Sequence, residues 1–304
     1  MKHCNICPRN CNIDRDSKVG FCKSKNLKIN SVKRHYYEEP IVCGENGCGA
    51  IFFSGCNLKC IFCQNAEISH NNKGEEISVT QLAEIFKKLD NSNVENINLV
   101  TPTHFTDEII EALKIYRPKL PIMWNTSGYE KPETIQKLKD YVDIFLFDLK
   151  YFDSKLSLEY SKAEDYFKFA SQSLLMARKI IPEDVYNEKN KLIKGIIVRH
   201  LVLPQATNDS IKIVDFINDK LGNRTIVSLM SQYTPYYKAK QHKILKNCVS
   251  ELEYKRVVRH LINLNFENAF IQEKSSSDEC FIPNFNEKFD VTEFLKKSDF
   301  WIDK

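Results

Sequence analysis

The sequence has no long hydrophobic run, no internal repeat of fixed period and no strong excess of charge of one sign. No stretch approaches the roughly 18 apolar residues of a membrane-spanning helix, and the first residues lack the apolar segment of a secretory signal. We therefore expect a cytoplasmic protein with no membrane partner. The 44 basic and 40 acidic residues give a net charge of only +4, which argues against nucleic acid as a partner.

The sequence does contain enough hydrophobic residues for a large core, and many cysteines. Its 304 residues, 42% of them hydrophobic, suffice for one main domain with additions, because α/β barrels of about 250 residues form single domains. The eleven cysteines are an odd number. They favour metal chemistry in a reducing compartment over a disulfide framework.

Short apolar runs alternate with amphipathic stretches from Gly49 onward, which is typical of βα units around a parallel sheet. The pattern predicts an α/β protein with a partial (β/α)6 barrel over residues 46–272, a Cys-rich metal-binding extension over residues 1–45 and a tail over residues 273–304. Six runs are apolar enough to be strands buried on both faces: Ala50–Ser54, Ile97–Thr101, Pro121–Asn125, Val142–Leu149, Gly195–Leu203 and Thr225–Met230.

Helix signals separate the predicted strands. Ser78 and Gln81 fit a capping box at the start of the first connecting helix, and Pro132 fits the first turn of the third. Residues 233–247 are predicted to form a polar loop. Further helices are expected over residues 107–116, 163–180, 208–222 and 251–264, with a short strand over Ala269–Gln272.

Polar residues gather where the predicted strands end, which is the edge where ligands bind in barrels and open α/β sheets. Asp148 and Arg199 stand inside strongly apolar runs, so each needs a partner or a ligand. Lone histidines at such ends, His104 and His200, are more often structural than catalytic. The other polar residues at these ends are Thr101, Thr103, Asn125, Thr126, Ser127, Lys150, Ser231 and Gln232.

The run Cys56-x3-Cys60-x2-Cys63 supplies three thiolates within eight residues. A 4Fe-4S cluster used for electron transfer usually has four Cys ligands, and structural zinc has four protein ligands. Three thiolates leave one metal position open for a reactant. The alternatives are a zinc knuckle completed by a distant ligand and three unrelated buried thiols.

With Phe62 before its last cysteine, this run resembles the signature of the radical S-adenosylmethionine (SAM) superfamily. The resemblance implies a 4Fe-4S cluster whose open iron chelates SAM, and one-electron cleavage of SAM to methionine and a 5'-deoxyadenosyl radical. The electron would come from a donor of the flavodoxin or ferredoxin type. The protein would orient and enclose the cofactor.

The chain from Cys4 to about Gln272 is similar to the pyruvate formate-lyase activating-enzyme-like branch of that superfamily. This resemblance implies an oxidoreductase in which Asp148 and Lys150 help to hold SAM, and Thr126 and Asp148 lie near a monovalent cation site. Asn125 stands where those activases have Asp, and a neutral amide would weaken the cation site. The similar segments are Glu38-Glu39-Pro40, Ile51–Cys56, Asn98–Phe105, Asn125–Tyr129, Asp148–Lys150 and Val198–His200.

One departure concerns the segment after the second predicted strand. The superfamily usually has Gly-Gly-Glu there, whose carboxylate receives the SAM amino group, whereas this chain has Thr101-Pro102-Thr103. The amino group must then find hydroxyls, carbonyls or another acid. We expect the cofactor-binding residues to be Thr101, Thr103, Asn125, Thr126, Asp148, Lys150 and Arg199. No residue identifies the substrate or a catalytic side chain.

A second group of cysteines lies within the first 22 residues. Cys4, Cys7, Cys11 and Cys22 offer four ligands, and four close thiolates repel one another unless a metal neutralises them. Structural zinc is our first interpretation and an auxiliary iron–sulfur cluster the second, with free packed thiols as the alternative. Of the remaining cysteines, Cys43 and Cys48 are expected to approach the Cys56–Cys63 run, and Cys248 and Cys280 to be small structural hydrophobes.

Three functions follow from these interpretations. The first is hydrogen-atom abstraction from a protein or peptide glycine, with modification of another peptide or a small molecule as the enzymatic alternative. The second is an electron-transfer or metal-binding module without turnover. The third, RNA modification, ranks last because the charge is nearly balanced; it would use a basic aromatic surface formed by Tyr233, Tyr236, Tyr237, Lys238 and Lys240.

Overall fold

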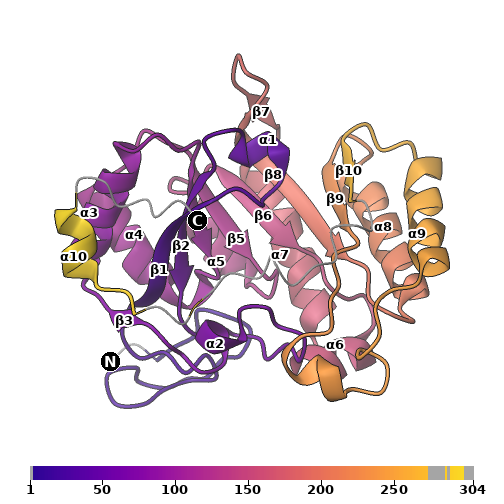
Figure 1. Cartoon of the computed structure of the whole chain (residues 1–304), viewed down its shortest axis with the longest axis horizontal. Helices are drawn as coiled ribbons and strands as arrows, with labels where there is room; N and C mark the ends of the chain where they lie inside the picture. The colour runs from indigo at the N-terminus through magenta and orange to yellow at the C-terminus, as the bar shows by residue number, and fades with distance from the viewer. Residues whose placement is uncertain (1–2, 273–284, 286–287, 298–304) are drawn as a thin grey trace.

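The computed structural model describes residues 3–272, 285 and 288–297, which form a mixed sheet with helices packed on it (Figure 1). Successive parallel strands pair along the sheet. All six predicted strands are confirmed, together with the short strand near residue 270. The parallel strands are β2 (Cys48–Phe53), β4 (Ile97–Val100), β5 (Ile122–Thr126), β6 (Ile144–Asp148), β8 (Leu192–Leu201), β9 (Ile226–Met230) and β10 (Ala269–Ile271).

Three antiparallel strands complete the sheet: β1 (Lys28–His35), β3 (Glu75–Glu76) and β7 (Val185–Tyr186). The strand order is β10-β9-β8-β6-β5-β4-β2-β1-β3, with β7 paired to β8. The sheet is therefore an open, partial barrel. Strand β1 was not predicted, and it pairs with β2 although it falls within the predicted 1–45 extension. The division into domains stays a prediction.

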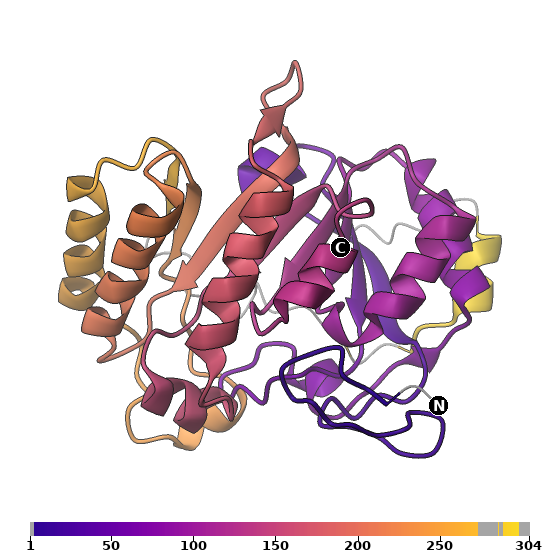
Figure 2. The same ribbon diagram turned by 180° about the vertical axis from the view of Figure 1, so that it is seen from behind.

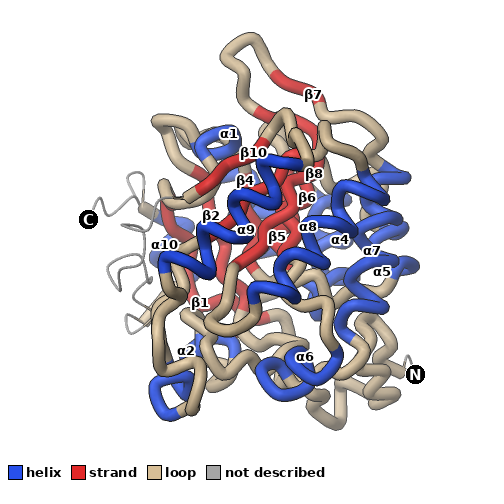
Figure 3. Tube along the Cα trace, turned by 90° about the vertical axis from the view of Figure 1, so that its right-hand side faces the viewer, coloured by secondary structure: helices blue, strands red, loops and turns tan. Residues whose placement is uncertain are grey.

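Helices cover one side of the sheet, as the rear view in Figure 2 and the side view in Figure 3 show. The capping box of Ser78 and Gln81 is confirmed at the start of α3. The helices are α1 (Pro40–Cys43), α2 (Ala66–Ser69), α3 (Val79–Asp90), α4 (Thr106–Ile115), α5 (Pro132–Lys137), α6 (Ser154–Ser161), α7 (Tyr166–Ile180), α8 (Thr207–Leu221), α9 (Glu251–Asn263) and α10 (Val291–Lys296), with 3-10 turns η1 (Thr103–Phe105) and η2 (Tyr237–Gln241).

The segment predicted as a polar loop is partly buried. Tyr233 is only 2% exposed, its ring packs on Phe62 at 5.9 Å between centroids, and its hydroxyl donates to the Leu245 carbonyl. One member of the proposed aromatic surface for nucleic acid is thus a core residue. Within the described residues, no helix is long and apolar enough to cross a membrane.

Two expectations about single cysteines are wrong. Cys43 and Cys48 form a disulfide at the amino end of β2, whereas the Cys56–Cys63 run follows the carboxyl end of that strand, so the pair does not approach the run. Cys248 is exposed and is not a buried hydrophobe. Cys280 and most of the predicted tail lie outside the described residues.

Candidate functional site

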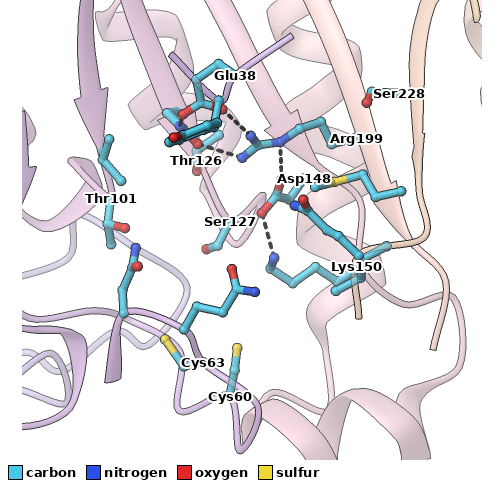
Figure 4. A pocket seen from close by; sticks show the side chains of 18 of the residues that line it. Glu38, Cys60, Cys63, Thr101, Thr126, Ser127, Asp148, Lys150, Arg199 and Ser228 are labelled. Atoms are coloured by element: carbon cyan, nitrogen blue, oxygen red, sulfur yellow. Dashed lines mark hydrogen bonds and ion pairs between the residues drawn. The ribbon is translucent and has the colours of Figure 1, made fainter. Parts of the chain in front are cut away.

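A cavity of about 330 Å³ lies at the carboxyl edge of the sheet (Figure 4). On one side it is bounded by residues 54–65, which we call the cysteine loop. Six of the seven predicted cofactor-binding residues line this cavity with Cys56, Cys60 and Cys63; Thr103 does not. Residues at or after the carboxyl ends of five parallel strands therefore lie together around this cavity, namely β2, β4, β5, β6 and β8.

The three thiols of the cysteine loop are close to one another and poorly solvated. Burial, followed by the nearby Cys60 thiolate, raises the pKa of Cys56 to about 11, and the same causes raise the pKa of Cys63 to about 12. Ser161 donates a hydrogen bond to the Cys60 sulfur at 3.0 Å. Since bound iron stabilises thiolates against such effects, the donor set fits an iron–sulfur cluster with three protein ligands.

Arg199 connects three neighbouring strands across the cavity. Its guanidinium donates to Asp148 on β6 at 2.8 Å, to the Asn125 amide oxygen on β5 at 2.8 Å and to Glu38 at 2.7 Å. Burial disfavours the charge of Arg199, but Asp148 and Glu38 raise its pKa above the usual value. Arg199 was expected to need a partner or a ligand, and its charged partners are the carboxylates of Asp148 and Glu38.

Lys150 extends the network toward the cysteine loop. Its ammonium donates to the second Asp148 oxygen at 2.6 Å. Burial would raise the pKa of Asp148, but Arg199 and Lys150 together hold it below its usual value. Burial likewise opposes the charge of Lys150, whereas Asp148 and the Cys60 thiolate raise its pKa. Both side chains stay charged at neutral pH, beside the thiols.

Two acidic residues of the cavity, Glu38 and Glu39, were not predicted as site residues. They follow β1, whose last residue, His35, pairs with Cys48 at the amino end of β2. Glu38 accepts hydrogen bonds from the side-chain amides of Asn98 and Asn125, both at 2.9 Å. Glu39 is 7% exposed, burial raises its pKa, and its Oε2 has no hydrogen-bond partner among the residues that the structure describes. The end of the cavity away from the cysteine loop is therefore acidic (Figure 4).

Thr103 and Thr126 point to a different carboxyl group. Both hydroxyls donate to Oε1 of Glu130, at 2.7 and 2.6 Å, and the Trp124 indole joins them at 3.2 Å. Glu130 is fully buried, and burial raises its pKa. This acid sits four residues after Thr126, and this short-range pairing was not predicted from the sequence. It fixes the two threonine side chains from behind the cavity.

Backbone geometry marks two positions in the site. Gly128 has φ +81°, and a side chain there would collide with the Asp148 carbonyl, so the turn after β5 requires glycine. Thr101 has φ +60°, a strained conformation for a β-branched residue, while its amide donates to the Asn125 carbonyl at 2.9 Å. The backbone at Thr101 has a conformation that glycine favours.

Both histidines near the strand ends contact backbone carbonyl groups. His104 contacts the Ser54 carbonyl at 2.7 Å, and His200 contacts the Leu149 carbonyl at 2.7 Å. Burial lowers the pKa of His104 to about 3 and that of His200 to about 4. Neither residue lines the large cavity.

The N-terminal cysteines lie apart from the large cavity. Cys4, Cys7, Cys11 and Cys22 all line one small cavity, with His104 at its edge. Burial, and then the charges of the other three N-terminal cysteines, raise the pKa of Cys7. In the described part of the chain, no three Cys, His, Asp or Glu side chains converge as tightly as the ligands of one bound ion.

Comparison with known proteins identifies the class. Residues 50–217 match the radical SAM superfamily model. The uncharacterized protein MJ0674 of Methanocaldococcus jannaschii is 32% identical over 255 residues, which cover 80% of this chain and 69% of that protein. The chain therefore belongs to the radical SAM superfamily, and its cofactors are the 4Fe-4S cluster and SAM that the superfamily uses.

Two further relatives are more distant. A putative glycyl-radical enzyme activating enzyme of Haemophilus influenzae is 22% identical over 207 residues, covering 67% of this chain and 76% of that protein. SuiB of Streptococcus suis, solved with its precursor peptide SuiA, is similar in fold, with a TM-score of 0.50 and 16% identity over 79% of this chain. The match covers 52% of SuiB, so this chain spans about half the length of that protein.

Proposed function

We propose that this protein binds SAM between the cysteine loop and the Lys150–Asp148–Arg199 network and abstracts a hydrogen atom from a backbone glycine of a partner protein. The observation that carries the proposal is the single cavity that joins the three cysteines to this charged network. When bound, a 4Fe-4S cluster supplies the electron for reductive cleavage of SAM.

The chain's own residues position and enclose the cofactor. Asp148 is held ionised by its two cationic neighbours, so its oxygens can accept hydrogen bonds from hydroxyl or ammonium groups of SAM. Lys150 places a positive charge near the thiols, where the carboxylate of SAM would lie. Thr101 and Asn125 offer further polar atoms along the wall. They stand in for the carboxylate of the missing Gly-Gly-Glu segment.

The glycine substrate rests on resemblance to activases. The Haemophilus relative is named as a putative glycyl-radical enzyme activating enzyme. The segments Asn125–Tyr129 and Asp148–Lys150, which carry the resemblance in sequence, both border the cavity. The proposal implies a protein substrate and an electron donor of the flavodoxin or ferredoxin type.

A second candidate is radical modification of a small polar molecule. The observation that favours it is Glu39, a buried carboxyl group in the cavity lining whose Oε2 has no partner in the described part of the chain. An amine or hydroxyl of a substrate held there would satisfy that oxygen.

SAM cleavage tests the chemistry that both candidates share. We expect reconstituted wild-type protein with dithionite and SAM to form 5'-deoxyadenosine under anaerobic conditions, and the triple Cys56, Cys60 and Cys63→Ala variant to form none. Lys150→Gln should weaken SAM binding at least tenfold in equilibrium dialysis. Lys155→Gln, a change at an exposed lysine on α6, serves as the matched control. Equal SAM affinity in the two lysine variants would contradict the assigned role of Lys150.

The glycine proposal requires a separate readout. A candidate glycyl-radical protein incubated with the reduced enzyme and SAM should show the doublet of a glycyl radical in its EPR spectrum, and the triple cysteine variant should give no doublet. If SAM is cleaved but no candidate partner acquires the doublet, modification of a small molecule replaces glycine-radical formation as the proposed function.

A further inference from the structure

The N-terminal thiol site, which we define as Cys4, Cys7, Cys11 and Cys22, is not used by the proposed reaction. Its four sulfurs border one small cavity, and none of the four forms a disulfide. Cys7 is only 8% exposed. Local contacts bring the sulfurs together: the Cys4 amide donates to the Ile13 carbonyl at 2.8 Å, and the Phe21 amide donates to the Cys11 sulfur at 3.4 Å.

We propose that these four thiolates bind a second, structural metal centre, and that this centre holds the N-terminal segment against the cysteine loop. Four thiolates are the ligand set of both structural zinc and iron–sulfur clusters. The sulfurs would draw inward onto one zinc ion or remain apart around an iron–sulfur core, since they do not converge tightly in this structure. The shared chemistry is a tetrathiolate centre.

The first link to the cysteine loop passes through Gly55. The Ser24 hydroxyl donates to the Ser54 carbonyl at 3.1 Å. Gly55 has φ +87°, and a β-carbon there would lie 2.6 Å from the Cys22 carbonyl oxygen. The backbone of a site cysteine thus packs directly on the residue before Cys56. Figures 1 and 2 show the N-terminal segment beside the loop that carries α2.

The second link is Arg9, which lies between Cys7 and Cys11. Its Nε donates to the Asn57 carbonyl at 2.8 Å, one residue beyond Cys56. Its guanidinium also donates to the Lys162 carbonyl and stacks 3.7 Å from the centre of the Phe21 ring. Because two site cysteines flank Arg9, fixing their sulfurs on a metal also fixes the arginine. Arg9 is therefore a positioning residue for the cysteine loop.

Metal content tests the centre independently of activity. In the triple Cys56, Cys60 and Cys63→Ala variant the catalytic cluster has no ligands, so remaining metal belongs elsewhere. We expect that variant to retain about one zinc, or about four iron with matching sulfide, per chain. Adding Cys7→Ser and Cys11→Ser should remove it, whereas adding Cys248→Ser, at an exposed free cysteine, should not. Zinc and iron analysis distinguishes the two kinds of centre, and either result supports the site.

Thiol labelling of the triple variant provides a test without changes at the N-terminal cysteines. Cys248 should react with iodoacetamide at once, whereas the four N-terminal thiols should react only after a strong chelator is added. The proposal is overturned if the triple variant holds no more zinc or iron than the variant lacking Cys7 and Cys11, or if the four thiols label as fast as Cys248 before chelation.

Amide hydrogen exchange tests the link to the cysteine loop. Chelation in the triple variant should speed exchange in residues 54–65 by at least tenfold, with no change in β5 and β6. Arg9→Gln should also speed it while leaving the metal content unchanged. Unchanged exchange in this loop after the metal is removed would show that the centre does not hold the loop.

Discussion

Arg199 donates hydrogen bonds across the cavity to Asp148, Glu38 and Asn125, and its side chain is only 12% exposed. Arg199→Gln would leave Asp148 and Glu38 buried without their shared counter-charge. We expect the free energy of unfolding to fall by about 3–5 kcal/mol. Urea denaturation measures this loss. Lys255→Gln, which breaks a solvent-exposed pair with Glu251 on α9, should cost less than about 1 kcal/mol, and similar losses would contradict the expectation.

Thr101 stores strain at the site because its φ of +60° disfavours a β-branched side chain. We expect Thr101→Gly to stabilise the fold by about 1 kcal/mol, seen as a higher Tm. If the Thr101 hydroxyl also contacts SAM, the same variant loses SAM affinity while Thr101→Ser keeps it. A lower Tm for Thr101→Gly would show that the strain is not relieved by glycine.

His200 should make stability fall as the pH is lowered. Burial keeps its pKa near 4 in the folded chain, against about 6.5 when unfolded, so between those values only the unfolded state takes up the proton. The nearby groups are the Leu149 carbonyl, Lys150 and Asp148. From pH 7.5 to 5, wild type should lose about 2 kcal/mol more than His200→Asn, which cannot titrate. Urea denaturation at both pH values measures this, and parallel losses would refute it.

Among the elements, α3 allows the clearest test of a local sequence signal. Ser78 accepts from the Gln81 amide at 3.0 Å, and the Gln81 side chain accepts from the Ser78 amide at 2.8 Å. Ser78→Ala should cost about 1 kcal/mol and lower Tm by roughly 2 °C. Ser171→Ala in the middle of α7, where the hydroxyl bonds only the Lys168 carbonyl, should change Tm less.

The strands show why part of the fold could be predicted from the sequence. β2 and β4 are buried along their whole length, so they read as continuous apolar runs. β1 has the sequence Lys-Ile-Asn-Ser-Val-Lys-Arg-His and buries Asn30 and Ser31, so no alternation marks it as a strand. Its existence depends on pairing with β2, which a local pattern does not contain.

The site residues also fall into two groups, those that could be predicted from the sequence and those that could not. Residues directly after strands, such as Asp148 and Lys150, were predicted because parallel strands end at one edge. Glu38 and Glu39 reach the cavity only because β1 runs antiparallel to β2 and delivers them to its other end. The role of Glu130 could not be predicted, because it depends on the direction in which the Thr103 and Thr126 hydroxyls point.

On the scale of the whole molecule, two cysteine groups from separate segments of the chain lie at one edge of the sheet. The cysteine loop follows the first parallel strand, and the N-terminal thiol site packs against it through Gly55 and Arg9. The two groups have different surroundings, since one faces a cavity of about 330 Å³ and the other a small enclosed one. This difference fits one reactive and one structural centre.

The acidic end formed by Glu38 and Glu39 lies apart from the cysteine loop, although both border one cavity. Tyr37, the neighbour of Glu38, also lines the cavity and is 63% exposed, so the acidic end is not closed off behind the loop. SAM beside the cysteine loop would therefore leave these acids accessible to a second molecule, and the two ends of the cavity can be occupied independently.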